Sequence, residues 1–161
     1  MRRLAIAIAM TAVCFALTTV VANADQPPAT TFIAVLTSDQ ETGACANFSN
    51  SARGVAIFHV TDETTGTVEW KLVANNLPGT DVAAHIHAAP AGKAGPVVQP
   101  LSFTPTTANG VIGTGSFSNP ALLAAIRANP SNYYVNVHTA PNCPAGAIRG
   151  QLDMHGPSNQ P

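Results

Sequence analysis

Charge is scarce in this sequence: Lys, Arg, Asp and Glu make up 9% of its 161 residues, against roughly 25% in an ordinary soluble domain. Hydrophobic residues account for 46%. Disordered chains are rich in charge and poor in aliphatic residues, so this composition predicts a folded chain, and the length suits one domain. Seven basic residues cannot provide the basic surface that phosphate binding requires. We therefore expect no nucleic-acid partner.

The sequence also lacks the motifs of several common enzyme classes. The run from Gly115 to Ser118 has no closing glycine and is not a nucleophile elbow. Residues 92–95 (GKAG) lack the spacing of a phosphate-binding or dinucleotide-binding loop. The adjacent acids Asp62 and Glu63 lie in a predicted turn, where a solvated role is favoured over glycosidase chemistry. We expect a protein that is not an enzyme, and we assign no catalytic residue.

Long apolar runs are absent except at the amino end. Arg2 and Arg3 precede an uncharged stretch of 18 residues, 4–21, and the small residues Ala22–Ala24 follow it. A membrane-spanning helix is the alternative, because such a stretch could just cross a bilayer. The Ala-x-Ala exit and the turn-prone residues after it favour a cleaved signal peptide over residues 1–24. We predict cleavage after Ala24, export to the periplasm or the medium, and no membrane span in the mature protein.

Cysteine is rare as well. The chain has three, and Cys14 leaves with the predicted signal peptide. The remaining two, Cys45 and Cys143, pair most simply as one disulfide in an exported domain. A disulfide that closes so long a loop is expected to stabilise the fold by about 4–5 kcal/mol in the loop-entropy model. Two free thiols, or a thiolate metal ligand, are the alternatives.

What the sequence does contain is a succession of short β-strand patterns. In residues 67–74, Val68, Trp70 and Leu72 alternate with the polar Glu69 and Lys71, which is typical of a half-buried strand. Similar patterns recur along the chain, in residues 31–37, 54–61, 67–74, 82–87, 97–101, 111–117, 133–139 and 147–153. About eight short strands predict an all-β fold, a sandwich or a small barrel.

One helix interrupts the strands. Asn119 can cap its first turn and Pro120 suits the position that follows. Residues 121–128 favour its propagation, and Asn129 followed by Pro130 ends it. The expected fold therefore contains one short helix besides the strands.

Histidine carries the main chemical signal. On a strand, His85 and His87 point to one face, and His138 shares a face with Tyr134 and Asn136. The aliphatic residues of both strands take the opposite face, which we expect to be the core. If the two strands are neighbours, the three histidines converge on the outer face or at one end of the fold.

A His-x-His pair with a distant third histidine is a credible site for copper or zinc, since imidazole nitrogens bind both metals. We therefore single out His85, His87 and His138 as candidate metal ligands. A fourth ligand or a ring-orienting partner could come from one of three other polar residues, His59, Glu69 or Asp81. The alternative is structural: the histidines bond to loop carbonyls and hold the turn after His87 against the neighbouring strand.

Arg149 is the most conspicuous cation of the last predicted strand. It shares a face of that strand with Gln151 and Asp153. We expect Arg149 to hold a turn carbonyl or a carboxylate, in preference to binding a ligand.

Several segments together carry a family resemblance: AHIH at 84–87, Gly92 with GPVV at 95–98, and YVNVHT at 134–139 leading into IRGQL at 148–152. In this combination the chain resembles the CHRD domain, the module repeated in chordin and found singly in exported bacterial proteins. AVLT at 34–37 with Gln40-Glu41, and GVA at 54–56, fit the family's first two strands. The likeness covers about residues 31–153 and leaves 154–161 as a flexible tail.

The resemblance implies an immunoglobulin-like antiparallel β-sandwich. It also implies an exported, non-enzymatic binding or structural module whose extracytoplasmic partner is unknown. In chordin such modules belong to an extracellular antagonist of bone morphogenetic proteins, a role that nothing in this chain supports. Two features depart from the family: Glu41 is followed by TGAC where prolines are usual, and the Cys45/Cys143 pair is an addition.

A copper or zinc protein is the alternative function. The His-x-His pattern on an all-β exported scaffold is also similar to Cu/Zn superoxide dismutase. No zinc loop rich in His and Asp follows His87, however, so dismutase activity is not expected.

Overall fold

The structure of the protein is a computed structural model and describes residues 30–49 and 51–155. In this part of the chain eight antiparallel strands form one sheet, in the order β5-β4-β7-β8-β1-β2-β3-β6. The strands are β1 (Thr31–Thr37), β2 (Arg53–Asp62), β3 (Thr67–Asn75), β4 (Thr80–Ala88), β5 (Val97–Pro100), β6 (Gly110–Ser118), β7 (Tyr133–Ala140) and β8 (Cys143–His155). The helices are α1 (Pro120–Ala128) and three single turns, η1 (Ser38–Gln40), η2 (Gly43–Cys45) and η3 (Pro130–Asn132).

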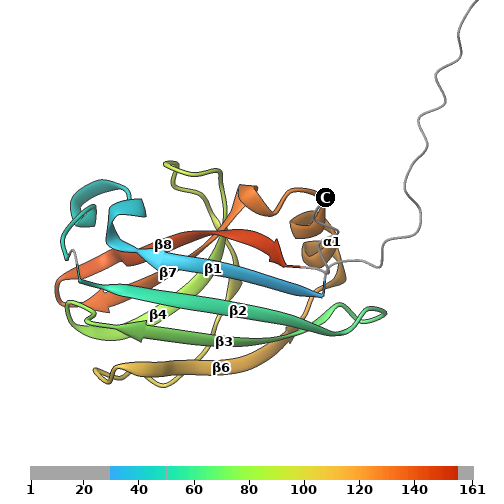
Figure 1. Cartoon of the computed structure of the whole chain (residues 1–161), viewed down its shortest axis with the longest axis horizontal. Coiled ribbons are helices and arrows are strands. Elements are labelled where there is room, and N and C mark those ends of the chain that lie inside the picture. Colours follow the sequence, from blue (N-terminus) through green and yellow to red (C-terminus); the bar gives the residue numbers. More distant parts are fainter. Residues whose placement is uncertain (1–29, 50, 156–161) are drawn as a thin grey trace, which may run out of the picture.

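The predicted all-β fold, with eight antiparallel strands and one α-helix, is confirmed. Its strands hydrogen-bond in one continuous sheet, whereas an immunoglobulin-like sandwich has two separate sheets. The sheet curls into a half-barrel (Figure 1) because the right-handed twist of its strands accumulates from one edge to the other. One face therefore encloses the core.

The core follows from the period-two alternation of the strands. Phe32 and Leu36 of β1 and Leu72 of β3 are buried, and their sequence neighbours face outward. Trp70 lies in the same cluster. Burying one large apolar side chain stabilises the fold by about 1.5–3 kcal/mol, so this alternation fixes which face of each strand points inward.

Helix α1 packs against one end of the half-barrel (Figure 1), and the residues that predicted it have the expected roles. The side chain of Asn119 accepts a hydrogen bond from the backbone N–H of Leu122 at 3.0 Å. Pro120 occupies the first position of the helix. Leu122, Leu123 and Ile126 are buried in the main core cluster, so the helix covers part of the core with its apolar face.

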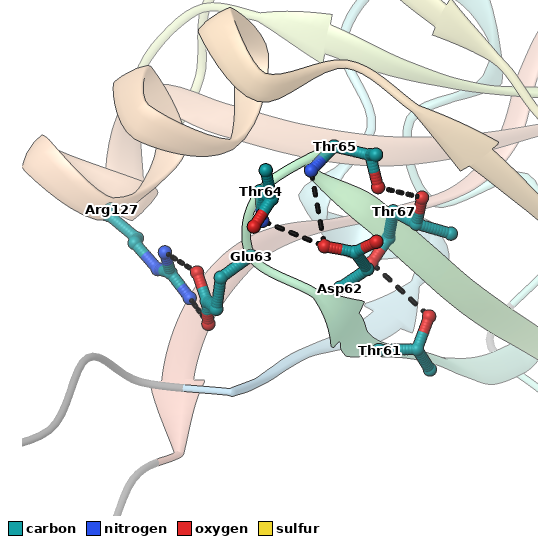
Figure 2. Close-up of polar contacts among 7 residues, drawn as sticks. All are labelled: Thr61, Asp62, Glu63, Thr64, Thr65, Thr67 and Arg127. Carbon is teal, nitrogen blue, oxygen red and sulfur yellow. Dashed lines mark hydrogen bonds and ion pairs between the residues drawn. The ribbon is translucent and has the colours of Figure 1, made fainter.

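The turn between β2 and β3 is built by its own acids (Figure 2). The carboxylate of Asp62 accepts hydrogen bonds from the backbone N–H of Thr65 and of Thr64, and these bonds lower the pKa of Asp62. Glu63 accepts two parallel hydrogen bonds of 2.6 and 2.7 Å from the guanidinium of Arg127 on α1. Both acids are exposed, in agreement with the predicted solvated role, and they also make these structural contacts, which the sequence did not predict.

The predicted disulfide between Cys45 and Cys143 is present in the structure, with the two Cα atoms 5.8 Å apart. It joins η2 to the first residue of β8. With Ala147 the two cysteines form a second, smaller buried cluster, against which Leu77 packs. Neither sulfur is therefore available as a thiolate ligand.

The structure describes part of the predicted carboxyl-terminal tail, but it does not describe the predicted signal peptide. Strand β8 continues to His155, and Met154 pairs with Phe32 of β1. Met154 and His155 therefore belong to the β1–β8 ladder, and not to the flexible tail predicted from residue 154. The predicted signal peptide with its cleavage site, and residues 156–161, lie outside the described residues. Within the described ranges no helix is long and apolar enough to cross a membrane.

A testable consequence concerns Gly150 of β8. A Cβ atom added there would lie 2.1 Å from the carbonyl oxygen of Val35 on β1. The Val35 carbonyl and the Gly150 Cα that would carry the Cβ both belong to strand backbones, so neither can move aside easily. We expect Gly150→Ala to lower the free energy of unfolding by about 1–3 kcal/mol, measured by urea denaturation. The control Thr114→Ala, at an exposed position of β6, should change it by less than about 0.5 kcal/mol. Equal stability of the two variants would contradict this account of β1–β8 packing.

Candidate metal centre

The three histidines singled out from the sequence converge in the structure. Their strands are direct neighbours, and β7 pairs with β4 along nearly its whole length. His85 and His87 project from β4, and His138 projects from β7. One potential ligand atom from each ring lies within 4.8 Å of the others, with His85 Nδ1 and His138 Nε2 3.1 Å apart. The alternation of the sequence predicted that the histidines of each strand point away from the core, and the pairing of β4 with β7 brings the three rings close together.

A bulge in the β4–β7 ladder assists this convergence. The register shifts between Asp81 and Ala83, so that His138 lies opposite Ala83 while His85 lies opposite Asn136. His87 faces Tyr134 across the ladder. The ring of His138 therefore approaches His85 diagonally, with their centroids 5.0 Å apart.

Backbone carbonyls fix the protonation of two of the rings. His87 Nδ1 lies 2.9 Å from the carbonyl oxygen of Gly95, and His138 Nδ1 lies 3.0 Å from that of Pro144. A carbonyl only accepts, so each Nδ1 carries the hydrogen and each Nε2 keeps its lone pair. His85 Nδ1 can then donate to His138 Nε2. In many metal sites a ligating histidine bonds to a carbonyl through its other nitrogen in this way.

The spacing of the three nitrogens is near that of a small metal site. Bonds of about 2.0–2.1 Å place two nitrogens on one ion no more than about 4.2 Å apart. His85 Nδ1 and His138 Nε2 already satisfy this limit, and His87 needs only a small side-chain movement to join them. His87 Nε2 is buried and has no hydrogen-bond partner among the described residues. Three neutral nitrogen donors on one face can hold copper or zinc.

Burial keeps these rings in the neutral form that metal binding needs. Burial lowers the pKa of His85, His87 and His138, and a nearby positive charge on His138 lowers the pKa of His85 further. The carbonyls of Gly95 and Pro144 oppose this effect on His87 and His138. A lower pKa means that the lone pairs stay available to a lower pH than in an exposed histidine.

Tyr134 supports the site from beneath. Its ring stacks on that of His87, with centroids 4.7 Å apart and planes 8° from parallel. The guanidinium of Arg149 lies over the same tyrosine, 3.4 Å from the ring centroid. Since β4 and β8 flank β7, the histidine and the arginine reach Tyr134 from opposite sides. This row of three planar groups fixes the plane of the His87 ring.

Arg149 and Gln151 hold the loop that follows β4. Arg149 donates to the carbonyl of Pro90 at 3.0 Å, and Gln151 donates to that of Ala89 at 3.0 Å. The loop returns at Gly95, whose carbonyl is the partner of His87. Arg149 is 1% exposed. The expectation that it holds a turn carbonyl is confirmed, and the contact indirectly orients a candidate ligand.

None of the three candidate fourth ligands joins the cluster. Asp81 is buried, and its carboxylate accepts a hydrogen bond from the backbone N–H of Thr106 at 2.5 Å. Glu69 and His59 lie opposite each other on β3 and β2, which are not neighbours of β4 or β7. Sheet order therefore separates them from the three histidines. The potential ligand group found among the described residues contains His85, His87 and His138 alone.

Sequence reasoning missed Glu41 as a member of this face. Its side chain is 6% exposed, and one carboxylate oxygen lacks a partner among the described residues, as does the side-chain oxygen of Asn136. Both oxygens lie within 2.7 Å of the point where a Cβ of Gly146 would be. Burial raises the pKa of Glu41 to about 7, against the lowering effects of the Thr42 N–H and the Arg149 charge. A protonated Glu41 supplies a donor among these acceptors.

Comparison with known proteins assigns the whole domain to one family. The family model of the CHRD domain matches residues 32–152, which is nearly all of the described chain and includes every candidate ligand. No curated protein and no solved structure matches.

Glu41 gives the site region a pH dependence that can be tested. Its pKa is near 7 in the folded protein and near 4.5 when exposed, so the folded state holds the proton more tightly. Its contribution to stability is full below about pH 4.5 and is lost as the pH rises through 7. We expect Glu41→Gln, which stays neutral, to gain about 2–3 kcal/mol relative to wild type between pH 5 and pH 8, measured by urea unfolding. The exposed Glu69→Gln should show no such gain, and a gain equal in both variants would contradict the role of burial.

Proposed function

Because this chain belongs to the CHRD domain family, whose members are binding or structural modules of extracellular type, we propose that it is an exported, non-enzymatic module that binds one metal ion. The ligands are His85, His87 and His138, and the ion is copper or zinc. Export would follow from the signal peptide predicted over residues 1–24, with cleavage after Ala24.

One observation carries the proposal: the Nε2 of His87 is buried and has no hydrogen-bond partner in the described part of the chain. A buried polar atom without a partner costs about 1–3 kcal/mol, so native structures rarely leave one unpaired. This atom belongs to a ring whose other nitrogen is held by the Gly95 carbonyl, whereas His138 Nε2 lies 3.1 Å from His85 Nδ1. A purely structural role explains the two carbonyl contacts. It does not explain why one ring nitrogen of each histidine lies within 4.8 Å of the others.

Donor chemistry favours copper over zinc. All three donors are imidazole nitrogens, and sites of this kind bind divalent copper more tightly than zinc. The cysteines are paired in the disulfide, so they contribute no thiolate that would favour a different ion. Metal selection in the cell also depends on supply, which makes zinc the second ion to test.

The first test is metal retention. The purified protein is equilibrated with copper or zinc, desalted and analysed for metal. We expect about one equivalent in the wild type and none in His85→Ala/His87→Ala/His138→Ala, because this variant removes every candidate ligand. His59→Ala is the matched control, since it removes a histidine outside the cluster, and it should retain metal like the wild type. Equal retention in the triple variant and the wild type, or none in the wild type, would refute the proposal.

The pH dependence of retention provides a second test. Protonation competes with the metal for each imidazole, and burial lowers the pKa of all three. We expect metal to stay bound at pH 7 and to be released only below about pH 6. Metal content after desalting at stepped pH values between 8 and 4.5 measures this. Release that is complete already at pH 7, or absent at pH 4.5, would speak against imidazole ligands.

A further inference from the structure

We propose that the Cys45–Cys143 disulfide is a positioning element of the metal site, acting on His138 through the backbone of Pro144. This inference rests on the proposed function, since it explains how one of the three ligands is oriented. It gives the disulfide a specific role in addition to stabilising the fold.

The first step of the argument is an interruption of the β7–β8 ladder beside His138. Val137 pairs with Ile148, and Thr139 pairs with Cys143. The single residue His138 therefore lies opposite the segment 144–147, which bulges out of the ladder. Regular strand pairing does not hold His138 on this side. Its contact on this side is the Pro144 carbonyl, 3.0 Å from Nδ1.

The second step is that the disulfide anchors this bulge at Cys143, the residue just before it. Cys143 directly precedes Pro144 and is fully buried. Its partner Cys45 belongs to η2, and the Cys45 sulfur also contacts the carbonyl of Asn142 at 3.6 Å. Ala147, at the far end of the bulge, belongs to the same small buried cluster as the two cysteines. The segment that presents the carbonyl is thus fixed at both ends around the disulfide.

The segment that carries Cys45 is itself held in place. Ser38 is buried, its side chain donates to the carbonyl of Ser49 at 2.6 Å, and its own carbonyl accepts from the N–H of Asn47 at 3.0 Å. These bonds close the loop over 38–49 on itself. The disulfide therefore connects the bulge to a hydrogen-bonded loop, and this connection restrains the position of Pro144.

The third step is that the other carbonyl-held ligand is independent of the disulfide. His87 is oriented by Gly95, in the loop that Arg149 and Gln151 hold. The disulfide lies at the opposite side of the site, next to His138. Loss of the disulfide should therefore act on the metal through His138 and leave His87 unaffected, which makes the two effects separable.

The experiment is a double-mutant cycle on metal affinity. Copper affinity is measured by competition with a chromophoric chelator for four proteins: wild type, Cys45→Ser/Cys143→Ser, His138→Ala and the combination. Removing an outer partner of a ligating histidine commonly lowers affinity by about 10–100-fold. We expect a loss of that size in Cys45→Ser/Cys143→Ser relative to wild type. In the His138→Ala background, removing the cysteines should change affinity less than about threefold.

Each other result overturns the proposal in a distinct way. Unchanged affinity in Cys45→Ser/Cys143→Ser shows that the disulfide does not position the ligand, although the metal site stands. Equal losses in both backgrounds show a general loss of stability with no path through His138. No copper bound by the oxidised wild type refutes the proposed function itself.

A second variant covers the case in which the cysteine-free protein does not fold, as judged by circular dichroism. Pro144→Gly keeps the disulfide and loosens only the bulge, because glycine frees the backbone that presents the carbonyl. We expect it to lower copper affinity in the same direction, and to have no further effect in the His138→Ala background. Wild-type affinity in Pro144→Gly would overturn the proposal on its own.

Discussion

The pairing of β7 between β4 and β8 is the constraint on which the candidate site depends. These strands are distant in sequence, and β7 alone brings the histidines of β4 and the arginine of β8 to one face. Its inward residues, Val135 and Val137, are fully buried, and they lock the strand's orientation. Turning them outward would move His138 into the core. The apolar side of β7 therefore determines where its polar side can act.

The outer face of these strands is unusual because it is buried and polar. In most half-barrels the outward residues are solvated, but here Glu41, Asn136 and Arg149 are each at least 94% buried. The loop after β4 and the loop bearing Cys45 supply partners for this layer. Arg149 is held by carbonyl groups and by the face of Tyr134, so its charge is dispersed over several weak partners. The hydrogen bonds of Arg149 and Gln151 join this layer to the loop after β4, which suits a site whose ligands must be held in register.

Sequence reasoning reached the strands, the helix and the ligand set because each leaves a local pattern. The period-two alternation located the strands, and Asn119 with Pro120 located α1. It could not reach the adjacency of β4 and β7, which depends on pairing between segments distant in the chain. Nor could it predict that the carbonyls of Gly95 and Pro144 bond to the histidines, because every residue has a backbone carbonyl and the sequence does not distinguish these two. Glu41 was visible only as part of the family's opening motif, since nothing local distinguishes a buried glutamate from an exposed one.

The separation of the ligands along the chain has a consequence for where metal can enter. His85 and His87 lie together in β4, but His138 joins them only after β7 has paired. An unfolded chain thus offers a two-histidine chelate, and the complete site exists only in the folded domain. If the chain crosses a membrane unfolded, it cannot carry a fully coordinated ion with it. The protein would then bind a metal that is present where its folding finishes. The compartment in which it folds, as much as its ligands, would decide which ion it binds.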